Sequence, residues 1–192
     1  MNKNTVTSDA DKPSPDSIVL IGFRGSGKST VGRLLSQQLG RPFIDTDVMI
    51  THAAGETIKD IFDRGGESLV RKLESEAVRQ ATHIPGAIIS AGGGAVLAAE
   101  NARRLRDCGW VIWLDAPAQV LWARINADTA SQSSRPNLTS AGGLSEVSAL
   151  LAQRKDIYAS VADVVVAADR SPESVAAHIL NLMLKRQNHI PE

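Results

Sequence analysis

The sequence predicts an α/β fold in which helices cover both faces of a five-stranded parallel sheet. Apolar runs alternate along the chain with segments of helical spacing, and the intervals between the runs are too long for hairpins. Parallel strands need crossover connections, which place helices on the faces of the sheet. The expected strands are residues 17–22, 42–44, 87–90, 110–115 and 163–167. The expected helices are 30–39, 58–64, 69–82, 98–107, 118–127, 144–159 and 172–185.

The length and composition fit one globular domain. A chain of 192 residues with 43% hydrophobic and 22% charged residues can bury a sizeable core. Its 21 Lys and Arg balance its 21 Asp and Glu, which argues against non-specific binding to nucleic acid or to an anionic membrane. Cys108 is the only cysteine, so an internal disulfide is impossible and a reducing compartment, the cytoplasm, is expected. Cys108 itself we expect to be a small buried residue at the entry to a strand.

The two ends of the expected domain follow from composition. Residues 1–17 are polar, contain two prolines and lack the apolar region of a signal peptide, so they are predicted to be a disordered tail. A single domain is then expected over residues 18–188. No later run approaches the length of a membrane span.

The first strand leads into a phosphate-binding motif. Gly22, Gly27, Lys28 and Ser29 satisfy G-x-x-x-x-G-K-[ST] between an expected strand and an expected helix. The glycines let successive N–H groups point into one concavity at the N-terminus of a helix, where an anion is favoured. In this motif the lysine reaches the β- and γ-phosphates of a nucleotide, and the serine hydroxyl ligates Mg²⁺. The sequence therefore predicts a P-loop NTPase fold.

Two carboxylates follow the second strand. Asp45 and Asp47 lie at the carboxyl edge of the expected sheet, where doubly wound folds bind ligands. In extended chain, positions i and i+2 face the same side, so one carboxylate can hold Mg²⁺ and the other can accept a proton from an attacking hydroxyl. The alternative is that Asp45 or Thr46 caps a helix over "VMITHAA". Because the phosphate-binding motif is present, we favour the functional interpretation.

Two further stretches favour a ligand site. The "GGG" of residues 92–94 follows the third strand, and three consecutive glycines allow a ligand to approach the backbone closely. Residues 126–143 are rich in small polar residues and have almost nothing to bury, so this stretch is either disordered or a lid over a functional site. Arg135, the one basic residue in that stretch, suits closure on an anion.

Four arginines have no assignment from the pattern alone. Arg71, Arg124, Arg154 and Arg170 are each expected to be solvent-exposed when considered one at a time. Glu74 lies one turn from Arg71, so it is expected to be that arginine's solvated partner on one helix face.

Together these motifs resemble those of the shikimate kinases, the small P-loop enzymes of aromatic amino acid biosynthesis. The resemblance runs from Ile18 to Leu184. It rests on "GFRGSGKST", "FIDTD", "GGESLVRKLE", "GGGAV", "SRP" and "QRKDIYASVAD", in that order. It implies transfer of the γ-phosphate of ATP to the 3-hydroxyl of shikimate, with Mg²⁺. It also implies a three-layer α/β/α fold with a helical substrate-binding insertion at about 46–80 and a lid at about 126–143.

The resemblance implies a role for each site residue. The ATP phosphates are bound by Gly25, Ser26, Gly27, Lys28, Ser29 and Thr30. Ser29 and Asp45 hold the metal, while Asp47 contacts the reacting hydroxyl. The carboxylate of shikimate is held by Arg71 and Arg154, and its pocket is lined by Gly92, Gly93 and Gly94. Arg135 moves with the lid towards the transferring phosphate, and the adenine is flanked by Arg124, Arg170 and Pro172. Lys28, Asp47 and Arg135 are therefore the expected catalytic residues, and Glu74 is expected to hold the substrate arginine in place.

Two other functions remain possible at this point. Another small-metabolite kinase, such as a gluconate kinase, would also need to bind a carboxylate, although "DTD" with "GGGAV" fits the shikimate pattern better. A non-catalytic nucleotide-binding switch would not need Asp45, Asp47 and Lys28 together. We expect a monomer that acts on a small molecule and binds neither nucleic acid nor membrane.

Overall fold

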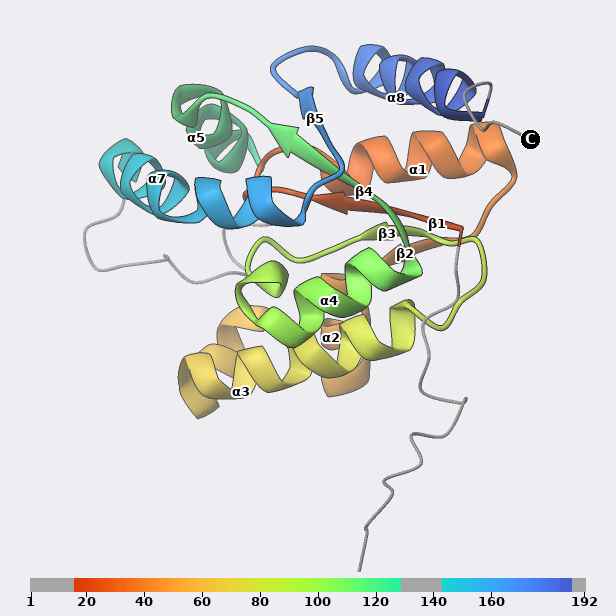
Figure 1. The fold of residues 1–192 in the computed structure, drawn as a ribbon. Helices are drawn as coiled ribbons and strands as arrows, with labels where there is room; N and C mark the ends of the chain where they lie inside the picture. The colour runs from red at the N-terminus through yellow and green to blue at the C-terminus, as the bar shows by residue number, and fades with distance from the viewer. Residues whose placement is uncertain (1–15, 129–142, 188–192) are drawn as a thin grey trace, which may run out of the picture.

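The computed structural model describes residues 16–128 and 143–187 and contains one five-stranded parallel sheet (Figure 1). The strand order is β2-β3-β1-β4-β5. The bounds are β1 Ser17–Ile21, β2 Phe43–Asp45, β3 Ile88–Ser90, β4 Gly109–Asp115 and β5 Val164–Ala167. The predicted α/β class and the five expected strands are confirmed, each to within one residue at either end.

Helices connect the strands, and the 3-10 turn η2 precedes α4. Their bounds are α1 Lys28–Leu39, α2 Thr46–Ala54, α3 Ile58–Ala81, η2 Ala95–Leu97, α4 Ala99–Cys108, α5 Ala118–Ala127, α7 Gly143–Val161 and α8 Pro172–Gln187. The two helices expected at 58–64 and 69–82 are one helix, α3, which is interrupted at Gly66. Gly66 has φ 65° and ψ −170°, a conformation that glycine adopts without steric cost.

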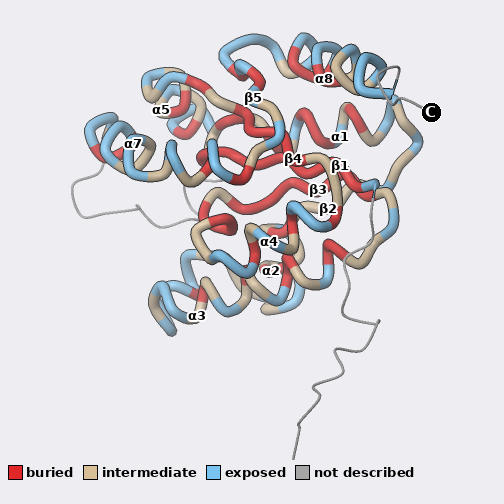
Figure 2. Tube along the Cα trace, viewed as in Figure 1, coloured by how far each residue is buried: buried red, intermediate tan, exposed pale blue. Residues whose placement is uncertain are grey.

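The strands alternate their side chains between two cores, as a sheet covered on both faces requires. In β1, Ile18 and Leu20 face one core, and Val19 and Ile21 face the other. In Figure 2 the three central strands β3, β1 and β4 are accordingly mostly red. The arrangement is three-layered, with the sheet between two helical layers.

Each helical layer contributes to one of these cores. Helices α1, α5 and α8 pack on one face, and α3 and α4 pack on the other. Helix α7 contributes to both, because Val147 belongs to the first core and Tyr158 to the second. Cys108 is fully buried at the end of α4, directly before β4, as expected.

A third, smaller core joins α2 to α3. It contains Ile50, Ile61, Val70 and Ala77. This core lies between the two helices, below the sheet in Figure 1. The region expected to bind substrate, residues 46–80, is helical and covers α2 and nearly all of α3.

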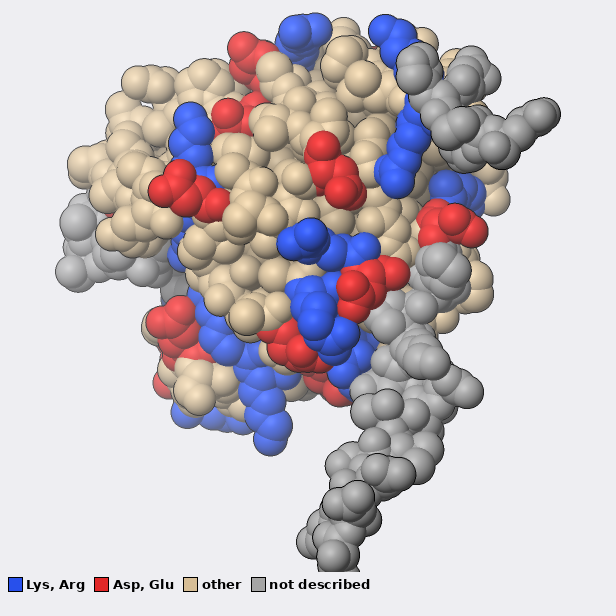
Figure 3. All heavy atoms as spheres, in the orientation of Figure 1, with Lys and Arg blue, Asp and Glu red and all other residues tan. Residues whose placement is uncertain are grey.

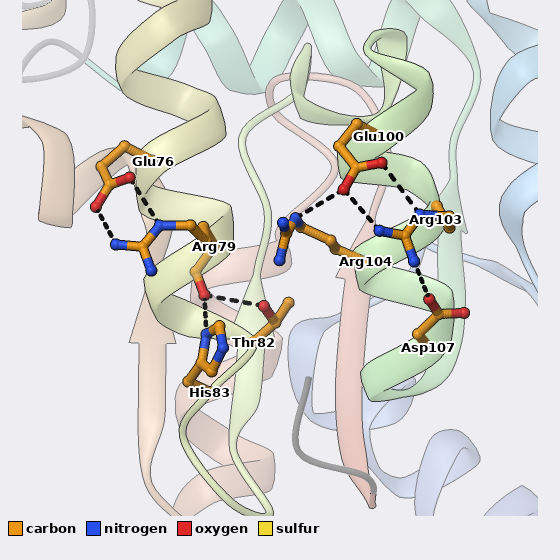
Figure 4. Close-up of polar contacts among 8 residues, drawn as sticks. All are labelled: Glu76, Arg79, Thr82, His83, Glu100, Arg103, Arg104 and Asp107. Carbon is orange, nitrogen blue, oxygen red and sulfur yellow. Dashed lines mark hydrogen bonds and ion pairs between the residues drawn. The ribbon is translucent and has the colours of Figure 1, made fainter. Parts of the chain in front are cut away.

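The outer surface of α3 and α4 carries interspersed charges (Figure 3). Arg79 pairs with Glu76 on α3, and Arg103 pairs with Glu100 and Asp107 on α4 (Figure 4). Exposed pairs of this kind contribute little to stability.

Some expectations lie outside the described residues. These are the tail up to residue 15 and residues 129–142 of the lid, which include Arg135. Ser17, which both the expected tail and the expected first strand included, begins β1. Within 16–128 and 143–187, no helix has the length and apolar character needed to cross a membrane.

Candidate active site

The candidate site lies at the carboxyl edge of the sheet. Gly22 follows β1, Asp45 ends β2 and Ser90 ends β3. Asp45 is in register with Ser90 across the β2–β3 pair, and Leu20 of β1 is in register with Ser90 on the other side. Three segments of the chain therefore leave the sheet at the same level, which is where parallel α/β sheets bind ligands.

The loop between β1 and α1 has the backbone of an anion site. Gly25 and Gly27 have φ of 83° and 90°, in the left-handed region that favours glycine. Gly27 is the N-cap of α1 and provides no side-chain cap, so the first N–H groups of the helix remain available to a ligand. The ammonium of Lys28 donates to the carbonyl oxygens of Gly22 at 2.8 Å and of Phe23 at 3.0 Å.

A cavity of about 330 Å³ adjoins this loop. Its lining includes the whole segment from Arg24 to Val31, and also Arg124, Arg170 and Pro172, the three residues assigned to the adenine. Arg124 donates from Nη1 to the carbonyl of Ala168 at 2.7 Å and from Nη2 to that of Arg170 at 3.1 Å. These bonds tie α5 to the segment after β5, so the two far walls of the cavity are held together.

Asp45 caps α2 and also contacts the phosphate loop. Its Oδ1 caps α2 by accepting from the N–H groups of Asp47 at 3.1 Å and Val48 at 3.4 Å. Its Oδ2 accepts a hydrogen bond from Ser29 Oγ at 2.5 Å. The expectation of an extended chain through Asp47 is wrong, because α2 begins at Thr46 and Asp47 lies in its first turn. The cap and the contact with the phosphate loop coexist because a carboxylate has two oxygens.

The pair Ser29 and Asp45 fits a hydrated magnesium ion. Ser90 Oγ lies 3.4 Å from Ser29 Oγ, so oxygen atoms gather beside the phosphate loop. Within the described ranges no three His, Cys, Asp or Glu residues form a metal-binding cluster. Mg²⁺ in nucleotide sites needs only one or two protein oxygens, since phosphates and water complete its shell.

Residues 92–94 form a glycine ribbon against which charged side chains pack. A Cβ added at Gly92 would lie 2.5 Å from Asp47 Oδ1 and 3.2 Å from Glu74 Oε1. One added at Gly94 would lie 2.0 Å from Arg71 Nη1. A side chain added at either position would displace the side chains of α2 and α3 that occupy this space.

The same ribbon contacts the phosphate loop. A Cβ at Gly93 would lie 3.2 Å from the backbone nitrogen of Arg24 and 3.6 Å from the carbonyl oxygen of Gly22. The nucleotide loop and the Asp47–Glu74–Arg71 group thus lie on two sides of a single stretch of backbone.

Arg71 and Glu74 are more buried than their positions in the sequence suggested. Arg71 pairs with Glu74, whose side chain is 7% exposed, and with Glu67 at 3.0 Å. The expectation that Glu74 is solvated is wrong, because the start of α2 and the glycine ribbon close over that side of α3. Arg154 on α7 lies with Cζ 5.6 Å from the ring centroid of Phe23, in the phosphate loop.

These charges act on one another. Burial raises the pKa of Glu74, and the nearby carboxylate of Asp47 raises it further. The positive charges of Arg71 and Arg154 act in the opposite direction, but the pKa remains raised. Burial alone would lower the pKa of Arg71, but Glu74 and Glu67 outweigh it and leave the pKa raised. Arg71 and Arg154, from separate helices, therefore both act on the same buried carboxylate.

Comparison with known proteins identifies the family. The family model for shikimate kinase matches residues 24–184. The chain belongs to the shikimate kinase family. The shikimate kinase of Symbiobacterium thermophilum is 43% identical over 170 residues, which are 88% of this chain and 97% of that protein.

Solved structures of the family have the same fold. The shikimate kinase from Acinetobacter baumannii, in complex with shikimate, matches with a TM-score of 0.84 and 31% identity, over 93% of this chain and 97% of that one. The enzyme from Aquifex aeolicus matches with a TM-score of 0.75 and 35% identity, over 90% and 98%. Membership confirms the predicted shikimate kinase resemblance, the P-loop fold and the reaction class, a kinase with an alcohol acceptor.

The structure brings together most of the residues that the family resemblance assigned. One edge of the sheet is surrounded by the phosphate loop, the glycine ribbon and the side chains of Asp45, Asp47, Arg71, Glu74 and Arg154. Arg135 lies outside the described residues. The unpredicted residues at the site include Arg24, Thr46, Ser90 and Tyr158. Arg24, Thr46 and Tyr158 stand inside the quoted motifs, which was a usable signal, whereas Ser90 lies outside them and its contact depends on tertiary structure.

Proposed function

We propose that this protein transfers the γ-phosphoryl group of ATP to the 3-hydroxyl of shikimate. The observation that carries the proposal is the shared glycine ribbon. Its Gly93 abuts the phosphate loop, while Asp47 and Arg71 pack against its neighbours Gly92 and Gly94. An acceptor held by these side chains would lie beside the phosphates, and phosphoryl transfer depends mainly on such positioning.

On the donor side, the backbone from Gly25 to Thr30 would hold the phosphates of ATP. Lys28 would exchange its bonds to two loop carbonyls for bonds to the β- and γ-phosphates. Ser29 and Asp45 would hold Mg²⁺, which when bound neutralises charge on the phosphates. Arg124, Arg170 and Pro172 would flank the adenine at the far wall of the cavity.

On the acceptor side, Asp47 would accept the proton of the attacking hydroxyl. Arg71 and Arg154 would bind the carboxylate of shikimate, because guanidinium groups match a carboxylate in geometry and charge. Glu74 would hold Arg71 in place from its buried side. Arg135 is proposed to reach the transferring phosphate from the lid, which would exclude water.

The proposal is tested by measuring ADP release in a coupled assay with shikimate, quinate and gluconate as acceptors. Turnover is expected with shikimate, and Asp47→Asn should abolish it while ATP still binds. Faster turnover with gluconate would identify another small-metabolite kinase. ATP binding without turnover on any of the three would identify a nucleotide-binding switch.

We also propose that the enzyme acts as a monomer in the cytoplasm, with a small molecule as its partner. The single cysteine, which is buried, fits the reducing cytoplasm, and the balanced charge argues against nucleic acid or an anionic membrane as the partner. Sedimentation velocity at micromolar concentration should give the mass of one chain, and a dimer mass would contradict the proposal.

A further inference from the structure

Two buried hydroxyl groups form hydrogen bonds with the glycine ribbon. Thr46, which is fully buried, accepts a hydrogen bond at Oγ1 from the N–H of Gly92 at 2.9 Å. Tyr158, also fully buried, donates from its hydroxyl to the carbonyl oxygen of Gly93 at 2.6 Å. Two adjacent ribbon residues are thus bonded to side chains from two different helices, α2 and α7.

We propose that Thr46 and Tyr158 are positioning residues that fix the ribbon, and through it the acceptor site, relative to the phosphate loop. This inference rests on the proposed function and extends it to two residues that need not touch either substrate. Three consecutive glycines are the most flexible backbone a chain can have, so a ribbon of this kind holds one conformation only if its surroundings impose it.

Thr46 is placed to couple the ribbon to the two aspartates. It stands between Asp45, which meets Ser29, and Asp47, which packs on Gly92. Its bond to Gly92 therefore fixes the start of α2 against the ribbon at the point where both carboxylates lie. Without that bond, the start of α2 would still fix the distance between the carboxylates of Asp45 and Asp47. The distance from these carboxylates to the ribbon would no longer be fixed.

Tyr158 is placed to couple the ribbon to the arginine side. Its ring packs on Trp113 of β4 with centroids 5.7 Å apart, so the sheet itself anchors it. Arg154 lies one helical turn earlier on α7, and burial raises the pKa of Tyr158 to about 12 despite the nearby charge of Arg154. The phenol therefore stays neutral and able to donate its hydrogen bond to the ribbon over the pH range of an activity assay.

The test uses Thr46→Val and Tyr158→Phe, which each remove one of these hydroxyl groups, and Thr46→Ser, which keeps the hydroxyl and removes only a methyl group. Thr46→Val and Tyr158→Phe should each raise the KM for shikimate about tenfold and lower kcat, because a buried polar group loses its partner and the ribbon relaxes. The KM for ATP should stay within about twofold, since the phosphate loop keeps its own bonds. Thr46→Ser, which keeps the hydroxyl, should restore shikimate KM.

Thr82→Val provides the matched control. Thr82 is also fully buried, and its hydroxyl donates to the carbonyl oxygen of Arg79 at 3.0 Å, at the end of α3 and away from the site (Figure 4). It should lower Tm as Thr46→Val does, with both KM values unchanged. The comparison is decisive because a KM does not depend on how much of the enzyme is folded.

The proposal would be overturned if Thr46→Val and Tyr158→Phe lowered Tm but left shikimate KM at the wild-type value. It would also be overturned if Thr46→Ser were as impaired as Thr46→Val. Calorimetric titration with shikimate supplies the same comparison where turnover is too slow to follow. Wild-type turnover in the same assay tests the proposed function separately, so its failure is not confused with a failure of the positioning role.

Discussion

Replacing Gly94 with alanine should displace the guanidinium of Arg71 while leaving the fold intact. The added Cβ would lie 2.0 Å from Nη1, 2.8 Å from Cζ and 2.9 Å from Nη2 of Arg71. Ordinary contacts begin at 3.4 Å, so the nearest atom has to move by about 1.4 Å. The backbone itself tolerates alanine, because Gly94 has φ −103° and ψ −6°.

The expected cost falls on function. Arg71 is a long side chain whose end can swing away, so Tm should change by less than about 2 °C. A guanidinium misplaced by more than 1 Å loses its alignment with a carboxylate, and such displacements lower kcat/KM by about 100-fold. The assay is the initial rate of ADP release with shikimate varied at saturating ATP, then with ATP varied. The KM for ATP should not change.

Gly109→Ala is the matched control. Its Cβ would lie 2.0 Å from the carbonyl oxygen of Ser17, which is backbone in β1 and cannot swing away. We expect Tm to fall by on the order of 5 °C with both KM values unchanged. Wild-type shikimate kinetics in Gly94→Ala would refute the reasoning, because Arg71 would then have no role where the structure places it.

Three further predictions concern the charged and buried groups. Arg71→Ala or Arg154→Ala should lower kcat/KM for shikimate by roughly 30- to several-thousand-fold, because a desolvated charged contact is lost, and lysine at either position should restore little activity. Arg79→Ala, on the same helix as Arg71, should have no effect. An equal loss in Arg79→Ala would indicate a defect in folding. Burial raises the pKa of Glu74 above 4.5, so the contribution of this group to stability is lost as the pH rises through the pKa of the folded state. Glu74→Gln should therefore flatten the dependence of Tm on pH above pH 4.5. An unchanged slope would contradict this linkage. Burial raises the pKa of the Cys108 thiol to about 12, so a thiol reagent at pH 8 should label it only after denaturation, and rapid labelling of the native protein would show that α4 opens.

The local parts of this protein could be predicted from its sequence. Each strand contains a short apolar run that the sequence shows directly, so five strands were found to within one residue. The phosphate loop could be predicted equally well, because its glycines, Lys28 and Ser29 lie close together in the sequence. The conformation of the loop depends on these residues themselves.

Where local spacing allowed two structures, the prediction for Asp45 and Asp47 was only partly right. An extended chain and a helix start are both compatible with "DTD", and α2 begins at Thr46 because Asp45 caps it. The same carboxylate reaches Ser29, 16 residues earlier, which no local rule requires.

The acceptor site was decided by tertiary structure. A helical pattern shows which side of α3 carries Arg71 and Glu74, but not that the glycine ribbon and α2 close over that side and bury Glu74. The hydroxyls of Thr46 and Tyr158 reach the ribbon across 46 and 65 residues of sequence. Such contacts depend on the strand order β2-β3-β1-β4-β5, which brings the ends of distant strands to one edge. The sequence by itself determined the elements and the phosphate loop, because these depend on neighbours along the chain; only the packing of the sheet decided which side chains meet at its edge.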